Sequence, residues 1–314
     1  MSEVKKIATR ESYGNALVEL GKEHDDVIVL DADLAGATKT GIFQKAFPQR
    51  HIDCGIAEGN MMGVAAGLAA TGKVPFASSF AMFAAGRAFE QVRNSIGYPK
   101  LNVKIGATHA GISVGEDGAT HQCNEDIALM RTIPGMTVIV PSDDVEAKAA
   151  VKAAYEHQGP VYLRFGRLAV PVINDNPNYE FEIGKAITLR DGSDVAIIAA
   201  GLEVNEALVA AERLAEDGIQ AEVINMHTIK PLDSEAVLKA AEKTGKIVTV
   251  EEHSVIGGLG SAVCDIVAET ACAKVMKIGV NDGFGESGPA GELIKKYELD
   301  GESIYKKVKA FVEK

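Results

Sequence analysis

Short apolar runs rich in β-branched residues recur along this chain, and helical patterns separate them. In the first half these runs cover 27–30, 74–78, 103–107, 137–140 and 161–165. Apolar residues at helical spacing lie between them, over 11–23, 58–70, 86–96 and 145–155. Continuous apolar strands joined by helices predict a largely parallel sheet with helices on both faces.

A similar alternation follows a stretch of turn-forming residues at 171–182. The second half has predicted strands at 195–199, 221–224, 247–250 and 274–278, and predicted helices at 203–217, 234–244 and 260–273. We therefore expect an α/β fold of two three-layer α/β/α domains with mostly parallel sheets. The expected first domain covers 1–172, a linker covers 173–184, and the second domain covers 185–314.

Charge and cysteine content exclude several classes of function. The formal net charge is −12, from 32 basic and 44 acidic residues, so we expect no binding to nucleic acid or to an anionic membrane. The first residues lack the apolar core of a secretion signal, and no apolar run is long enough to span a bilayer. The four cysteines show no Cys-x-x-Cys spacing, which favours a reducing, cytoplasmic location.

Glu58 is a lone carboxylate at the start of a small, apolar stretch. The residues at 63–70 include Gly63 and Gly67 and carry little side-chain bulk, which lets another backbone approach closely. An acid at the start of a helix often does no more than interact favourably with the helix dipole. In a helix buried between domains or subunits, however, the carboxylate can share a proton with a ring nitrogen of a ligand.

Further candidates follow the predicted strands, because ligands of parallel α/β sheets bind at the carboxyl ends of the strands. Phe80 and Phe83 come after the second predicted strand, where a flat heteroaromatic ring can stack on them. Asp33 comes after the first predicted strand. Arg164, near the end of the last strand of the first half, is a candidate phosphate ligand, although a surface ion pair explains it equally well.

A glycine-rich loop after the third predicted strand carries His109, Asp117 and His121. Their spacing matches no compact zinc pattern, so we expect no metal ligand among them. Two imidazoles and a carboxylate suit recognition of hydroxyl and phosphate groups together with proton transfer.

These motifs resemble the transketolase family, and specifically the C-terminal half of that enzyme. The similar segments are 31–34 (D-A-D-L), 55–70, 79–83 (S-F-A-M-F), 108–122 with its G-E-D-G-A-T-H-Q motif, and 284–290 (F-G-E-S-G-P-A). The resemblance spans essentially all 314 residues. It implies the pyrimidine-binding domain of a thiamine diphosphate enzyme in the first half, and the structural C-terminal domain of transketolase in the second.

The resemblance also implies roles for single residues. The implied catalytic residues are Glu58, which faces the aminopyrimidine ring, and the histidines His109 and His121. The implied substrate contacts are Asp33, His109, Asp117, His121 and Arg164. The implied cofactor contacts are Glu58, Phe80 and Phe83.

Two positions depart from the pattern of the family. Gly86 occupies the place of a third pocket aromatic, and we expect Phe89 to compensate from the same helix face as part of the cofactor site. A serine that contacts phosphate in the family is replaced within 36–38, where Thr38 is the expected substitute. Phosphate affinity or sugar choice is expected to differ as a result.

The diphosphate-binding half of the family pattern is missing, because the sequence contains no G-D-G motif. The resemblance therefore implies a split transketolase, whose N-terminal partner subunit holds the diphosphate and Mg²⁺. Thiamine diphosphate would lie at the shared interface, in a heterotetramer with two copies of each chain. Such a complex transfers a two-carbon ketol unit between sugar phosphates, a reaction of the pentose phosphate pathway; the preferred sugars stay open.

Three alternatives remain at this point. A deoxyxylulose phosphate synthase shares the pyrimidine-binding domain, but His109 argues against it. A 2-oxo acid dehydrogenase β subunit shares the two-chain layout, but the D-G-x-T-H motif of the loop argues against it. A regulatory or scaffolding subunit would not need Glu58, Asp117 and His121 together with His109.

Overall fold

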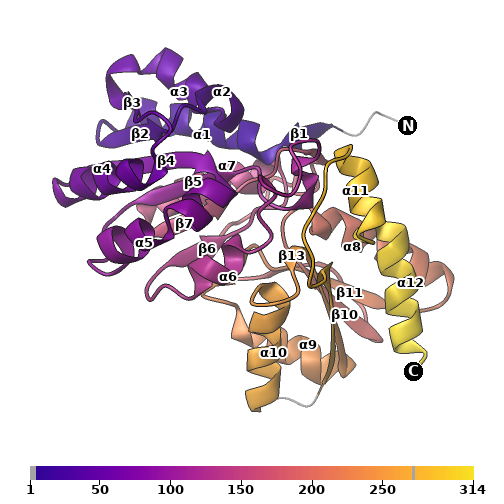
Figure 1. The fold of residues 1–314 in the computed structure, drawn as a ribbon. Coiled ribbons are helices and arrows are strands. Elements are labelled where there is room, and N and C mark those ends of the chain that lie inside the picture. The colour runs from indigo at the N-terminus through magenta and orange to yellow at the C-terminus, as the bar shows by residue number, and fades with distance from the viewer. Residues whose placement is uncertain (1–4, 271–272) are drawn as a thin grey trace.

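The computed structural model describes residues 5–270 and 273–314, and Figure 1 shows their fold. The strands of the first half are β1 (Lys6–Ala8), β2 (Val27–Asp31), β3 (His51–Asp53), β4 (Val74–Phe80), β5 (Lys104–Thr108), β6 (Thr137–Ile139), β7 (Val161–Arg164) and β8 (Ala169–Pro171). Those of the second half are β9 (Ile187–Arg190), β10 (Val195–Ala199), β11 (Ala221–Asn225), β12 (Thr228–Lys230), β13 (Lys246–Ser254) and β14 (Lys274–Val280).

Helices separate most of these strands. Those of the first half are α1 (Thr9–Glu23), α2 (Ala35–Thr38), α3 (Thr40–Ala46), α4 (Glu58–Ala70), α5 (Phe89–Gln91), α6 (Asp126–Arg131) and α7 (Asp144–Glu156). Those of the second half are α8 (Glu203–Glu216), α9 (Ser234–Thr244), α10 (Leu259–Thr270), α11 (Ala290–Lys296) and α12 (Gly301–Val312). Short 3₁₀ turns are η1 (Pro48–Arg50) and η4 (Ile112–Val114).

The strands of the described residues form two larger sheets and one small pair. The larger sheet has the order β12-β6-β7-β5-β4-β2-β3, and its neighbours are parallel except for β12 against β6. The second sheet has the order β14-β13-β10-β11-β9, and only β9 is antiparallel to its neighbour. β1 and β8 pair antiparallel beside them. The expected fold of two mostly parallel sheets is confirmed.

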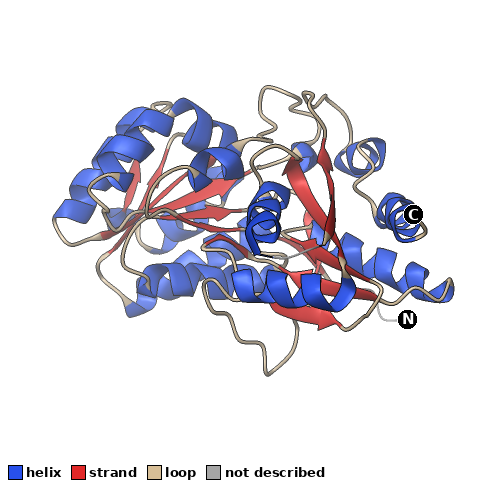
Figure 2. Ribbon diagram, turned by 90° about the horizontal axis from the view of Figure 1, so that it is seen from below, coloured by secondary structure: helices blue, strands red, loops and turns tan. Residues whose placement is uncertain are grey.

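Helices cover both faces of each sheet, as the layers in Figure 2 show. On one face of the larger sheet, Tyr13 of α1 and Val151 of α7 share a hydrophobic cluster with β2 and β4. On the other face, Met61 of α4 belongs to a cluster that also contains Ile105 of β5 and Ile198 of β10. The two sheets therefore share a continuous core, and a third cluster beneath α8 and α12 completes the second sheet.

The segment between β4 and β5 differs from the expected regular helix at 86–96. It consists of two π-helical segments, η2 (Met82–Arg87) and η3 (Val92–Gly97), joined by the single turn of α5. A π-helical turn holds more residues than an α-helical turn, so this segment fits more residues between its two ends than a regular helix would. Such π-helical segments occur often at functional sites. The last residues of the expected helix at 260–273 include 271–272, which lie outside the described residues.

The edge strand β12 also differs from expectation. Residues 228–230 were expected in the second domain without a strand, whereas they pair with β6 of the larger sheet. The division at 1–172, 173–184 and 185–314 stays a proposal.

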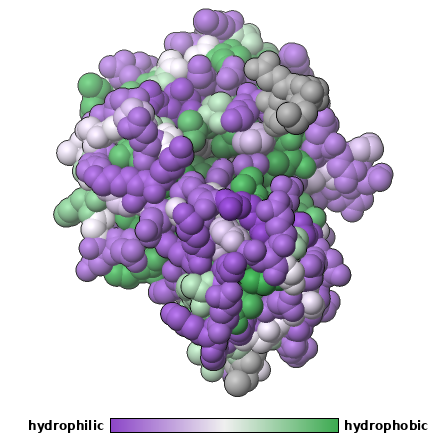
Figure 3. Space-filling model, turned by 90° about the vertical axis from the view of Figure 1, so that its right-hand side faces the viewer, coloured by the Kyte–Doolittle hydropathy of each residue, from purple (hydrophilic) through white to green (hydrophobic). Residues whose placement is uncertain are grey.

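The surface has few large exposed hydrophobic side chains. The face in Figure 3 is mostly hydrophilic, with hydrophobic side chains gathered in the hollow near its centre. The most exposed large hydrophobic residues in the described part of the chain include Ile56, Tyr98 and Phe284. Of the helices in residues 5–270 and 273–314, none combines the length and the apolar character needed to cross a bilayer.

Candidate functional site

Four adjacent parallel strands, in the order β7-β5-β4-β2, end at the same edge of the larger sheet. Phe80 is the last residue of β4, His109 follows β5 directly, and Asp33 follows β2 after one residue. Polar and aromatic side chains from separate parts of the sequence therefore meet at the sheet edge where ligands of parallel α/β proteins bind.

Aromatic rings form the centre of this site. The rings of Phe80 and His109 stack with their centroids 3.8 Å apart, and those of Phe80 and Phe83 with centroids 5.8 Å apart and an angle of 11° between the planes. His121 meets Phe83 edge-on at 5.3 Å. The structure thus brings together the two phenylalanines and the two histidines that the sequence singled out, and they offer a flat, apolar surface.

His109 is held in a strained backbone conformation, with φ of +56°. A non-glycine residue in the left-handed region costs free energy, and such strain concentrates at functional sites. The ring is buried, with Nδ1 2.9 Å from Thr108 Oγ1 and Nε2 3.0 Å from Arg10 Nη1. Because a guanidinium only donates, Nε2 must accept, which assigns the ring proton to Nδ1 and makes the imidazole neutral.

A cluster of positive charge surrounds His109. Arg10 of α1 also donates to Ala37 O at 2.9 Å, and Arg167, three residues beyond β7, donates to Glu116 Oε2 at 2.7 Å. Burial lowers the pKa of His109 to about 3, with further lowering by Arg10, Arg167 and His121. Burial also lowers the pKa of Arg10, and Arg167 adds to that shift. Two guanidinium groups held this close together favour an anion between them.

Sequence analysis missed both Arg10 and Arg167. Arg10 lies about one hundred residues before His109 in the chain, and only the pairing of the strands brings the two together. Arg167 lies three residues beyond the end of β7, whereas the residue predicted from the sequence, Arg164, is the last residue of that strand. The Arg10 Nε is buried and has no hydrogen-bond partner among the described residues, which is consistent with a donor aimed at a ligand.

Arg164 is not where the sequence led us to expect it. Its side chain is buried, with Nε donating to Asp126 Oδ2 at 2.8 Å and Nη2 donating to Glu252 O at 2.9 Å. These internal groups occupy the guanidinium, so Arg164 does not face the cationic cluster as a phosphate ligand. Thr38 is corrected likewise, because its buried hydroxyl donates to Asp31 Oδ2 at 2.9 Å.

Glu58 begins α4 and is almost fully buried, with 2% of its side chain exposed. Arg87 Nη1 donates to both of its carboxylate oxygens, at 3.0 and 2.9 Å. The same guanidinium lies over the ring of Phe83, 4.4 Å from its centroid. Glu58 is therefore linked to the aromatic surface through Arg87. Phe89, the expected extra cofactor contact, is half-buried and packs against the core cluster between the sheets, and its role at the cofactor stays a prediction.

The remaining candidates lie at the rim of the site. Asp117 is exposed in the loop, and His121 is half-buried with Nδ1 3.0 Å from Thr120 Oγ1. The backbone of Asp33 is in the left-handed region, with φ of +61°, and its amide donates to Asp53 Oδ1 at 3.1 Å. Among the described residues, no group of three or more His, Cys, Asp or Glu side chains is arranged to hold a metal ion.

Replacing Arg87 will measure how much its ion pair with the buried Glu58 contributes to the stability of the chain. Arg87→Met leaves a buried carboxylate unpaired and is expected to lower the free energy of unfolding by roughly 2 kcal/mol, less than for a fully buried pair because Arg87 is half exposed. The double variant Glu58→Gln with Arg87→Met is expected to recover most of this loss. Urea unfolding measures the free energy of unfolding of the single and the double variant. Equal losses in the two would contradict an interaction between Glu58 and Arg87.

Acid will destabilise the chain partly through His109. Its pKa is about 3 in the folded chain and ordinarily 6.5, so below pH 6.5 the unfolded chain takes up a proton that the folded chain does not. The free energy of unfolding therefore decreases as the pH is lowered. His109→Gln should reduce this decrease by about 1 kcal/mol per pH unit between pH 6 and 4. Burial lowers the pKa of His227 to about 4, so His227 also makes stability depend on pH. This contribution is the same in the unchanged chain and in His109→Gln. If the free energy of unfolding of His109→Gln depends on pH in the same way as that of the unchanged chain, the lowered pKa of His109 is refuted.

Comparison with known proteins supports this architecture. Residues 5–172 match the transketolase pyrimidine-binding domain family, and residues 184–304 match the transketolase C-terminal domain family. A putative transketolase C-terminal section of Methanocaldococcus jannaschii is 54% identical, covering 95% of this chain and 94% of that protein. A 6-deoxy-6-sulfo-D-fructose transketolase subunit of a Clostridium species is 48% identical, covering 94% and 91%.

A solved structure, described as a split gene transketolase in an inactive β4 tetramer, superposes with a TM-score of 0.90. It is 53% identical in sequence, and the match covers 98% of this chain and 99% of that one. The resemblance drawn from the sequence motifs is confirmed. With both of its halves matched, this chain belongs to the transketolase family.

Proposed function

We propose that this chain is the pyrimidine-binding subunit of a split transketolase and that it acts on sugar phosphates together with a partner subunit. The observation that carries the proposal is the pair of cations Arg10 and Arg167, which lies with the neutral ring of His109 against the stacked rings of Phe80 and Phe83. An anion site beside a flat apolar surface suits a phosphorylated substrate next to a ring-bearing cofactor. Relatives described as a C-terminal section and as a split gene transketolase support a two-chain enzyme.

The residues around the aromatic pair fit the aminopyrimidine ring of thiamine diphosphate. Phe80 and Phe83 would hold the ring by stacking, since their planes are nearly parallel. Glu58, buried nearby and linked to Phe83 through Arg87, would hold a proton at a ring nitrogen. When bound, the cofactor supplies the carbanion stabilisation that amino-acid side chains lack.

The polar residues would bind and orient the sugar. Arg10 and Arg167 would bind the phosphate, because their positive charges lie close together and the Glu116 carboxylate that pairs with Arg167 is exposed. The neutral ring of His109 would exchange its Arg10 contact for a substrate hydroxyl and accept a proton at Nε2. His121 would hold a proton near the reacting oxygen, Asp117 would accept from a hydroxyl, and Asp33 would line the approach to the site.

The partner subunit would supply what this chain does not. We propose that it holds the diphosphate and Mg²⁺, with the cofactor shared at the interface, in an assembly of two copies of each chain. The small residues Gly63 and Gly67 of α4, whose added Cβ atoms would meet nothing within 4 Å in this chain, leave room for such a contact. We expect the complex to act in the cytoplasm.

Reconstitution tests the two-chain proposal. Ketol transfer from xylulose 5-phosphate to ribose 5-phosphate, with thiamine diphosphate and Mg²⁺, is expected only when this chain is mixed with a diphosphate-binding subunit. Glu58→Ala should abolish it. Full turnover by the isolated chain would refute the split site, whereas full activity of Glu58→Ala in the mixture would favour a scaffolding subunit. Activity with pyruvate instead would favour the deoxyxylulose phosphate synthase alternative.

Arg167 provides the test of phosphate binding. Arg167→Gln is expected to raise KM for the sugar phosphate by roughly 10- to 100-fold with little change in kcat, since a charged hydrogen bond to phosphate is lost. An unphosphorylated ketose is the control, and its KM should not change. Arg164→Gln is the matched variant: it should lower stability instead, because Arg164 contacts internal groups. Equal KM changes for both ketoses would refute the phosphate role.

A further inference from the structure

The site loop is closed at its base by a backbone hydrogen bond. Gly111 N donates to Cys123 O at 2.9 Å, and the residues between them carry Asp117 and His121. His109 precedes this closure by two residues. The position of the loop relative to the sheet edge therefore depends on what holds its base.

A carboxylate from the other half of the chain holds that base. Glu252 lies on β13 of the second sheet, and its Oε1 accepts a hydrogen bond from the amide of Ser113, within the 3₁₀ turn η4. The approach is close, because a Cβ atom added to Gly111 would overlap the carboxyl carbon of Glu252. With φ of +78°, Gly111 also has a backbone conformation that suits glycine.

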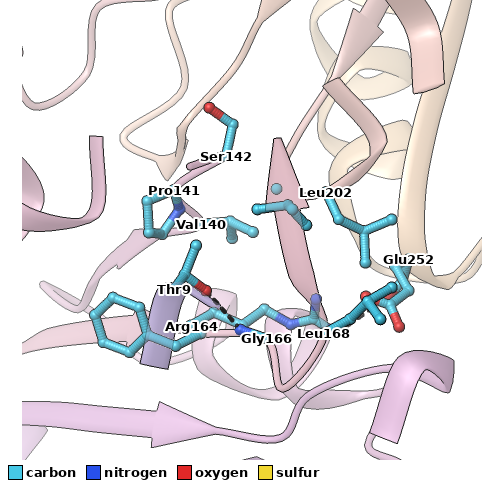
Figure 4. Close-up of a pocket in the computed structure, with 12 residues that line it drawn as sticks. Thr9, Val140, Pro141, Ser142, Arg164, Gly166, Leu168, Leu202 and Glu252 are labelled. Atoms are coloured by element: carbon cyan, nitrogen blue, oxygen red, sulfur yellow. Dashed lines mark hydrogen bonds between the residues drawn. The ribbon is translucent and has the colours of Figure 1, made fainter. Parts of the chain in front are cut away.

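Arg164 forms hydrogen bonds to the same two segments, the base of the loop and the strand β13. Its Nη2 donates to Glu252 O at 2.9 Å and to Cys123 O at 3.3 Å. One guanidinium therefore contacts both the strand that supplies the carboxylate and the carbonyl that closes the loop. Figure 4 shows Arg164 extending toward Glu252 along a small cavity, which has room for about one water molecule.

Burial of Glu252 costs free energy that an apolar side chain would not. Burial raises the pKa of Glu252 to about 7, although the Arg164 charge and the Ser113 amide act in the opposite direction, and Asp126 adds repulsion. Glu203 of α8 is a second buried acid close by, and burial together with Glu252 raises its pKa well above the usual range. Neither oxygen of Glu203 has a hydrogen-bond partner among the described residues. A buried acid in such surroundings contributes little to the stability of the fold, so we look for the role of Glu252 in what its hydrogen bond holds in place.

We propose that Glu252 is a positioning residue: through the Ser113 amide, it fixes the loop that carries His109, Asp117 and His121 at the site. The second domain thereby takes part in substrate binding without touching the substrate. The inference deepens the proposed function, in which this loop binds the sugar phosphate.

Hydrogen exchange of the isolated full-length chain tests the proposal directly. Glu252→Gln keeps an oxygen that accepts from the Ser113 amide, and the amides of 113–121 should exchange as in the unchanged chain. Glu252→Leu removes the acceptor, and these amides should exchange roughly tenfold faster while those of β10 and β11 do not. In the reconstituted enzyme Glu252→Leu should lower kcat/KM by roughly tenfold, and Glu252→Gln should stay within about twofold.

Glu203→Gln is the matched control, because it changes a buried acid that makes no hydrogen bond to the loop among the described residues. It should leave exchange of 113–121 and kcat/KM unchanged. If Glu252→Leu does not fold, Ser113→Pro removes the same hydrogen bond from the donor side, and the remaining amides of 114–121 should exchange faster to the same extent. Unchanged loop exchange in a folded Glu252→Leu or Ser113→Pro chain overturns the proposal. Exchange needs no turnover, so this outcome is distinct from a failure of the proposed function.

Discussion

The buried guanidinium of Arg164, on β7, joins two segments that lie far apart in the sequence, 123–126 and the strand β13. Its hydrogen bonds reach Asp126 at the start of α6, the carbonyl of Cys123 and the carbonyl of Glu252 on the second sheet. A buried arginine is stable only when its charge and donors are matched, and here that match requires both halves in their native places. The arrangement of the site loop depends on this junction.

The site itself combines several unfavourable features. His109 has a strained backbone, its imidazole is kept neutral among cations, and the Arg10 guanidinium is partly desolvated. Each feature lowers stability, and the continuous core between the sheets offsets them. A strained residue packed by rigid strands is already in position when a ligand arrives, so less ordering remains to be done on binding.

The sequence allowed most of the regular elements to be predicted, because buried parallel strands and amphipathic helices leave periodic patterns. α4 and α9 have the predicted bounds, and most strands differ by a few residues. Arg164 was predicted as the phosphate ligand and Arg167 was missed, because both lie near one strand end and only three-dimensional packing separates a buried arginine from an open one. Arg10 was missed for the same reason, and the π-helical turns near Arg87 have no simple periodicity.

The antiparallel strand β12 completes the edge of the larger sheet with residues 228–230. While the chain is being synthesised, β6 is made about ninety residues before β12, and its outer edge stays open through that interval. A ribosome that has made only the first half thus carries a sheet with an unpaired edge, which is prone to pairing with a neighbouring chain. Any attempt to produce the first half alone inherits that same exposed edge.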